Sequence, residues 1–186
     1  MKNSLIIMLL TLFVFSKAIA QTPTTTDWPL DAATQKYTYM EIVPTDGSTT
    51  EQLFNKAKTW ATLNKYILVR EDKARGEYIC RGMLRVKYIS PMPGLYHDGI
   101  VNWTMSIFAK DGKYKYVLTD FVHASGKGNG GKLENKEPQC GKFTLTIPGW
   151  ATIKKDSKTQ LEELVASLKM AMSAPDQKVK STGDDW

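Results

Sequence analysis

The chain has 186 residues, with 25 basic and 19 acidic side chains and a formal net charge of +6. Hydrophobic residues make up 42% of it and charged residues 24%, a balance that excludes a largely disordered chain and a collagen-like one. With two cysteines in this length it is not a disulfide-dense miniprotein either, so we expect one domain with a hydrophobic core.

The first twenty residues have the pattern of a secretory signal peptide. Lys2 supplies a positive charge, an apolar stretch runs from Leu5 to Phe15, and small residues precede a cleavage site between Ala20 and Gln21. We therefore predict an exported protein, periplasmic or secreted. The apolar stretch is too short to cross a bilayer as a helix, so we expect no stable membrane span in the mature chain. A retained N-terminal anchor is the alternative.

The remainder divides into three parts by composition. Residues 21–35 are rich in Thr, Asp and Pro and are predicted to be a linker. Residues 36–172 form the single predicted domain, and 173–186 a flexible tail with alternating charges. The domain has 21 basic against 14 acidic residues, a net charge of +7, so the basic character belongs to the folded part.

A strand and a helix open the predicted domain. Residues 37–43 are rich in Tyr, Thr, Ile and Val and end at Pro44, which indicates a strand. Ser48 with Glu51 three residues later is a capping-box pattern and predicts the start of a helix. One stripe of that helix is apolar and includes Leu53, Ala57, Trp60 and Ala61.

Four β-rich runs follow, at 66–70, 77–88, 100–109 and 114–123. Asp111 and Gly112 form a two-residue hairpin turn between the last two. After a long loop over 124–141, residues 143–147 suggest a further short strand, and Asp156 or Ser157 is expected to cap a last amphipathic helix. The main order is β-α-β-β-β-β-α, an α+β two-layer sandwich in which a curved antiparallel sheet is covered by two helices.

This order and the stretch from Tyr39 to Gly82 resemble a family of exported bacterial domains, domain of unknown function 4468, described as having a TBP-like (TATA-box-binding-protein-like) fold. The turn from Lys110 to Tyr114 and the terminal amphipathic helix fit as well. The resemblance implies the fold, but no activity and no catalytic residues. Since fold does not imply function, the fold name is no argument for DNA binding.

Motifs for catalysis, cofactors and metals are weak, so we expect no cofactor, no metal and no catalytic site. Gly126, Gly128 and Gly131 satisfy G-x-G-x-x-G, but no helical pattern follows, which favours a mobile loop over a phosphate site. The two histidines, His97 and His123, are predicted to lie on the surface.

The cysteines permit two arrangements. In an oxidising compartment Cys80 and Cys140 are candidates for a disulfide. The alternative is that Cys80 is a buried thiol, because free cysteine often behaves as a small core residue.

The one sequence feature that indicates a binding site is the polar side of the predicted strand at 77–88. Alternation places Arg81, Met83, Arg85 and Lys87 together on one face of the sheet, a candidate binding face. The alternative is an uncovered face made soluble by its charges.

We therefore expect a non-catalytic module of the cell envelope that binds an anionic ligand or an envelope protein. An envelope hydrolase with an unrecognised site is the alternative. A nucleic-acid-binding domain is a second, disfavoured by the export signal, so we expect no nucleic-acid partner.

Overall fold

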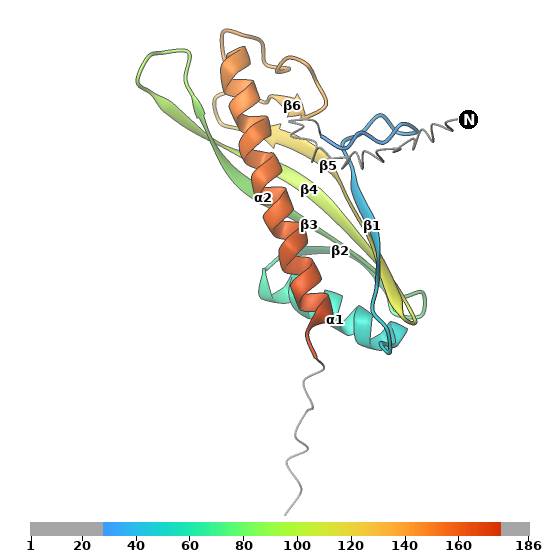
Figure 1. Cartoon of the computed structure of the whole chain (residues 1–186). Helices are drawn as coiled ribbons and strands as arrows, with labels where there is room; N and C mark the ends of the chain where they lie inside the picture. The colour runs from blue at the N-terminus through green and yellow to red at the C-terminus, as the bar shows by residue number, and fades with distance from the viewer. Residues whose placement is uncertain (1–27, 176–186) are drawn as a thin grey trace, which may run out of the picture.

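A computed structural model describes residues 28–175 of the chain (Figure 1). The predicted signal peptide, its cleavage site between Ala20 and Gln21, and residues 176–186 of the predicted tail lie outside the described residues. The elements are β1 (Tyr39–Pro44), α1 (Thr50–Leu63), β2 (Ile67–Asp72), β3 (Glu77–Ile89), β4 (Tyr96–Lys110), β5 (Lys113–Ala124), β6 (Gly131–Lys132) and α2 (Ile147–Ser173).

The strands form one antiparallel sheet in the order β1-β5-β4-β3-β2, and β6 pairs with the far end of β5. The long hairpin β3–β4 is its centre, with residues paired from Glu77 with Phe108 to Ile89 with Tyr96. β2 lies at one edge, and its pairing with β3 is irregular between Leu68 and Arg70. The predicted α+β class and element order are confirmed.

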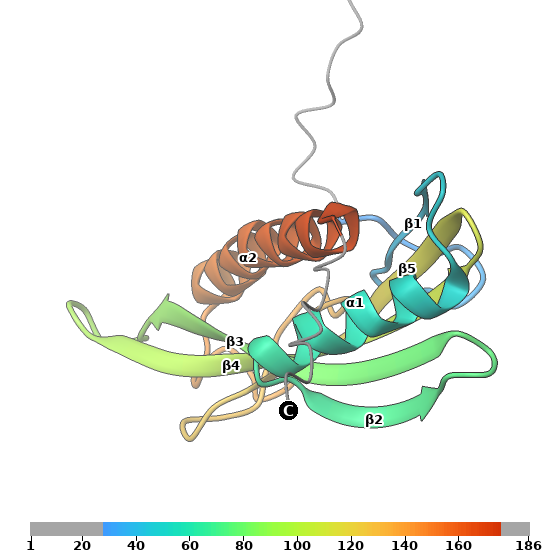
Figure 2. The ribbon, with the colours of Figure 1, turned by 90° about the horizontal axis from the view of Figure 1, so that it is seen from below.

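Both helices cover the same face of this sheet, as Figure 2 shows from the end of the molecule. The predicted apolar stripe of α1 is buried, and α2 buries a longer stripe that begins at Gly149 and ends at Met172. The two helices meet where the indole N–H of Trp60 donates to Oγ of Ser167 (3.1 Å). The architecture is therefore a two-layer sandwich with one covered face and one open face.

Alternating burial along the strands separates the two faces. A side chain that points toward the helices removes apolar surface from water, while its neighbour in the strand points the other way. Along the central strands the core is made by the following residues: Tyr78, Cys80, Val86, Tyr88, Val101, Trp103, Met105, Ile107, Tyr114, Tyr116, Leu118 and Phe121.

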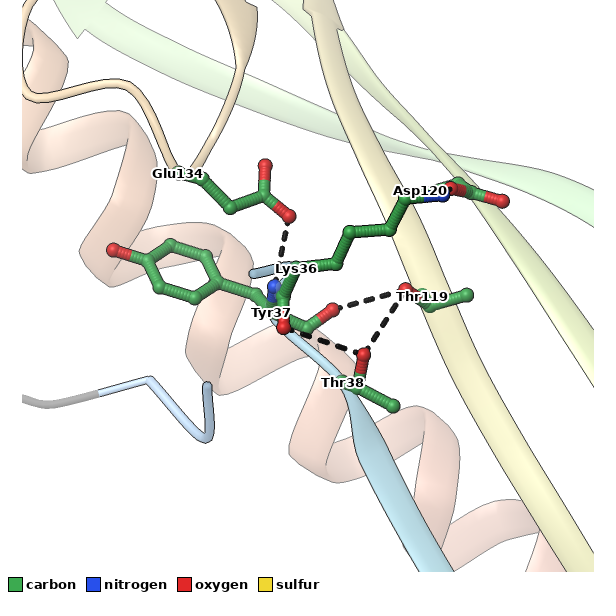
Figure 3. A network of polar contacts seen from close by, with 6 residues as sticks. All are labelled: Lys36, Tyr37, Thr38, Thr119, Asp120 and Glu134. Atoms are coloured by element: carbon green, nitrogen blue, oxygen red, sulfur yellow. Dashed lines mark hydrogen bonds and ion pairs between the residues drawn. The ribbon is translucent and has the colours of Figure 1, made fainter. Parts of the chain in front are cut away.

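A bulge in β5 breaks this alternation once. Asp120 has a left-handed backbone (φ 60°), and the pairing of β5 with β4 shifts between Asn102 and Thr104. Because of the extra residue, Leu118 and Phe121 both face the core although they are three residues apart. The carboxylate of Asp120 forms an ion pair with Lys36 (2.6 Å; Figure 3). This ion pair connects the segment just before β1 with the bulge of β5.

Residues 28–38, directly before β1, pack on the folded domain, although 28–35 lie in the segment predicted to be a linker; residues 21–27 of that segment lie outside the described residues. Trp28 is buried: its ring stacks on Tyr37 at 4.9 Å between centroids and packs near Phe121 at 5.4 Å. Leu30 and Tyr37 form an isolated antiparallel bridge. Composition suggested a linker because one apolar aromatic residue in a polar segment has no period to detect.

Both helices begin at other residues than predicted. The N-cap of α1 is Thr49, which forms a capping box with Gln52, one residue beyond the predicted Ser48 and Glu51. α2 begins at Ile147 with Thr146 as its N-cap, so residues 143–147 are not a strand, and the cap lies ten residues before the predicted Asp156. Pro148 looks like a helix breaker but stands in the first turn, where its missing N–H costs no hydrogen bond.

Candidate binding face

The open face of the sheet carries the four predicted site residues. Arg81, Met83, Arg85 and Lys87 are all exposed on β3, and they alternate there with residues of the covered face. Their order follows from the alternation of the strand, so one row of three cations and a thioether runs along the centre of the sheet.

The three cations of this row have no ion pair within residues 28–175. By contrast, Arg70 at the neighbouring edge is paired with Glu77, and the carboxylate of Asp120 is already bound by Lys36. Arginine stays protonated at any physiological pH and presents a planar set of donors that fits carboxylate, sulfate and phosphate groups. The row therefore has hydrogen-bonding capacity for an anion that the described part of the chain does not use.

A hollow of about 440 Å³ lies beside the bulge of β5. Its walls combine the Arg81 side chain with the amide of Asn102 and the hydroxyl of Thr104, and Asp120 stands at the bulge itself. Apolar side chains complete the lining: Ile67, Met83 and Val122. A cation next to hydroxyl, amide and apolar groups is suited to an anionic molecule that also has an apolar or sugar-like surface.

A second hollow, of about 350 Å³, lies further along the same face. Arg85 forms one wall, and the loop after β5 forms the other with Ser125, Gly126 and Asn129. The loop is held there because Ser125 donates its N–H to Oδ1 of Asn129 (3.3 Å) and its hydroxyl meets that of Tyr88 (2.8 Å). Two arginines four residues apart on one strand stand roughly 13 Å apart, so the two hollows can be reached by one extended ligand.

The glycine-rich segment does not form a nucleotide site. Gly131 begins the two-residue strand β6, and no helix follows it. Instead, Gly130 lies against Trp150 and His123, where an added Cβ would come within 2.4 Å of the indole ring. Glycine is needed here for close packing, which accounts for its presence without a phosphate.

His123 is buried, so its predicted surface position is wrong. Its Nδ1 accepts a hydrogen bond from the Gly130 N–H (3.0 Å), and its ring lies edge-on to Tyr88 and Trp150. Burial lowers the pKa of His123 to about 4. The bulge at Asp120 brings this residue to the covered face, a shift that a count of alternating residues does not include.

The disulfide between Cys80 and Cys140 is not formed in this structure, where both cysteines are free thiols. Cys80 is the buried thiol of the alternative interpretation, and burial raises its pKa to about 12. Cys140 is partly exposed in the loop before α2. No group of three or more His, Cys, Asp or Glu that could hold a metal occurs within residues 28–175.

The ionisable groups with large pKa shifts lie in the core rather than in the two hollows. Cys80, His123 and Tyr114 all face the helices. Burial raises the pKa of Tyr114 to about 12. Each hollow has a single carboxylate in its lining, Asp98 in one and Asp120 in the other. Besides that carboxylate, the polar side chains that line the hollows are an arginine in each, with the amide and hydroxyl groups of Asn102, Thr104, Ser125 and Asn129.

Sequence reasoning found the β3 row but missed its partners in the hollows. The positions of Asn102 and Thr104 could have been predicted, because both residues occupy polar positions of the alternating run at 100–109. Asp120 and Val122 were not, because their place depends on the bulge. Ser125 and Asn129 lie in a loop without a periodic pattern.

Comparisons with known proteins concern the fold. A family model described as domain of unknown function (DUF4468) with TBP-like fold matches residues 39–124. A crystal structure of a DUF4468 family protein from Bacteroides ovatus is similar, with TM-score 0.59 and 18% identity over 77% of this chain and 90% of that one. A TBP-like protein from Parabacteroides distasonis gives TM-score 0.56 and 17% identity over 76% and 95%. The comparison with curated proteins gave no match. Over residues 39–124 the chain thus matches the DUF4468 family, and its fold is similar to the two TBP-like structures.

Proposed function

We propose that the protein is a non-catalytic binding module of the cell envelope and that its open face binds an anionic partner. One observation carries the proposal: Arg81, Arg85 and Lys87 stand without ion pairs within the described residues, and the two arginines line two hollows of the same face. The export that this role needs rests on the pattern of the first twenty residues.

The arrangement favours an extended ligand over a compact one. A small ion would be held by one arginine, whereas a chain with repeated anionic groups reaches both hollows and gains from each. Charged side chains that become desolvated in such a complex gain hydrogen bonds of roughly twice the usual strength. An acidic polypeptide segment and a polyuronate glycan share this chemistry.

The test exchanges charges at two places on the open face. The variant Arg81→Glu with Arg85→Glu is compared with the control Lys113→Glu with Lys115→Glu. The control changes the net charge by the same amount, but at the start of β5, away from the two hollows. Binding to immobilised polyglutamate and polygalacturonate is measured between 50 and 300 mM salt, values we choose to span the physiological range. We expect the arginine variant to lose about tenfold or more in affinity and the control about twofold.

Equal losses in the two variants would show that only overall charge matters, and the proposed site would be abandoned. A wild-type protein that binds neither polymer at physiological salt would refute the anionic partner itself. A gel-shift titration with single-stranded DNA accompanies the test, because tighter binding there would favour the nucleic-acid alternative.

A further inference from the structure

The turn between β3 and β4 forms an apolar tip at one end of the molecule. We name residues 89–96 the hairpin tip; it projects beyond the helices in Figures 1 and 2. Four large apolar side chains are exposed on it: Ile89 (46%), Met92 (61%), Leu95 (47%) and Tyr96 (69%). The sequence has no charged residue between Lys87 and Asp98. Transfer of exposed apolar surface out of water is favourable, so the tip is suited to an apolar environment.

The backbone of the hairpin tip makes most of its hydrogen bonds internally. The Ser90 N–H donates to the Leu95 carbonyl (2.9 Å), and the Leu95 N–H to the Met92 carbonyl (3.3 Å). The Met92 N–H donates to Oγ of Ser90 (3.1 Å), while the residues at 91 and 93 are prolines without an N–H. In a lipid environment each unsatisfied N–H costs several kcal/mol, so this pattern lowers the cost of leaving water.

The beginning of α2 adds apolar surface at the same end. An added Cβ at Gly149 would lie 3.1 Å from the carbonyl oxygen of Ile89, so the first turn of α2 packs against the end of β3. Near this contact Ile147 is 40% exposed, and Phe143, four residues earlier, is completely exposed. The exposed side chains of Phe143 and Ile147 thus stand just before the turn of α2 that packs on the end of β3.

We propose that this end of the protein docks on the surface of a lipid bilayer that contains anionic headgroups. The tip enters the boundary between headgroups and acyl chains, where Tyr96 and Phe143 are well accommodated. Lys87, two residues before the tip, lies opposite Asp98 of β4, and both side chains stay at the level of the headgroups. The convex shape favours a bilayer over a protein partner, because a protrusion displaces lipid, whereas a protein would need a matching hollow.

Interfacial docking is consistent with the helices of the protein. Within residues 28–175 no helix is long and apolar enough to cross a bilayer. A few apolar side chains bind weakly and reversibly to a bilayer surface. This inference does not depend on the proposed function, because it uses the end of the hairpin and not the row of arginines.

The test is co-sedimentation of the protein with large vesicles of phosphatidylcholine, with and without phosphatidylglycerol. We compare Met92→Gln with Leu95→Gln against the control Met40→Gln with Met170→Gln, whose side chains are 59% and 74% exposed outside the tip. Neutral substitutions leave the net charge unchanged, and circular dichroism checks that each variant folds. We expect wild type to bind anionic vesicles, the tip variant to bind about tenfold less and the control to be within twofold.

A second measurement follows the tip itself. In Tyr96→Trp, brominated acyl chains should quench fluorescence, relative to unbrominated vesicles, more than they do in wild type, which has the same five other tryptophans. Bound protein without this additional quenching overturns the proposal. Failure of wild type to bind anionic vesicles overturns it too. A third outcome is that the tip variant still binds vesicles whereas Arg81→Glu with Arg85→Glu does not. The contact would then lie on the open face, which refutes docking through the tip without refuting the proposed function.

Discussion

At the scale of single residues, His123 best shows how this fold uses close packing. Its imidazole occupies the space left by two glycines: an added Cβ would come within 2.5 Å of Nε2 at Gly99 and 2.9 Å of Nδ1 at Gly130. Nδ1 accepts the one hydrogen bond given to the ring, so Nε2 carries the proton of the neutral form and has no partner. A charged imidazolium would lose that bond and its solvation together.

This burial predicts a loss of stability in mild acid. The pKa of His123 is lowered to about 4 in the folded protein, against about 6.5 in an unfolded chain. Between these values the unfolded chain binds a proton that the folded chain does not, so the stabilisation is complete above pH 6.5 and is lost as the pH falls toward 4. The contribution is about 3 kcal/mol over that window.

The measurement is urea unfolding at several pH values between 7 and 4.5. We expect His123→Gln, whose amide oxygen can still accept from the Gly130 N–H, to have a flatter pH dependence than wild type. A wild-type curve as flat as that of His123→Gln would contradict the buried neutral imidazole.

At the scale of elements, the two helices show what local sequence signals decide. Two overlapping caps are present before α1, Ser48 with Glu51 and Thr49 with Gln52, and both satisfy the spacing rule. The structure uses the second: Thr49 Oγ1 accepts from the Gln52 N–H (3.2 Å), and the Gln52 side chain accepts from the Thr49 N–H (2.7 Å). Tertiary contact favours it, because Asp111 receives the Thr50 N–H (2.7 Å).

The choice of cap is directly testable. Thr49→Ala should destabilise the protein by about 1 kcal/mol, since it removes an N-cap, whereas Ser48→Ala should change stability by only a few tenths. Thermal unfolding of both variants distinguishes the caps. The reverse ranking would mean that α1 begins one residue earlier.

The strands were predictable and the start of α2 was not, for a physical reason. Alternation over 77–88 and 100–109 records which side chains meet the helices, so those strands and the exposed row of β3 can be derived from sequence alone. Residues 147–155 include a proline, a glycine and three β-branched residues, so local propensity there opposes the helix that packing imposes. Tertiary burial of Trp150 and Ile153 outweighs it.

At the scale of the whole molecule, the boundary of the domain lies before β1. Trp28 fills a site formed by Tyr37, Tyr39 and Phe121, and Glu134 from the loop after β6 accepts the Tyr37 N–H (2.8 Å). The segment before the sheet thus connects the edge strand β1 to the loop at the far end of β5 (Figure 3). These contacts join residues about a hundred positions apart, so no local pattern in the sequence predicts them.

A truncation tests this boundary. A fragment of residues 36–175 should be less stable than 28–175 by about 3 kcal/mol, the usual cost of removing a large buried aromatic side chain. Chemical denaturation of both fragments gives the difference, and Trp28→Ala in the longer fragment should reproduce most of it. Equal stability of the two fragments would return residues 28–35 to the linker.

The edge strand β2 has a consequence for aggregation. Its outer side has no partner among the described strands, and Ile67, Leu68 and Val69 are between 45% and 64% exposed. Such an edge is a template on which another chain can add a strand and begin a fibril. Here the irregular pairing after Leu68 and the charges of Arg70, Glu71 and Asp72 leave three apolar residues, fewer than the roughly six that a steric zipper requires. The bulge in β2 therefore protects solubility at one of the two edges of the sheet.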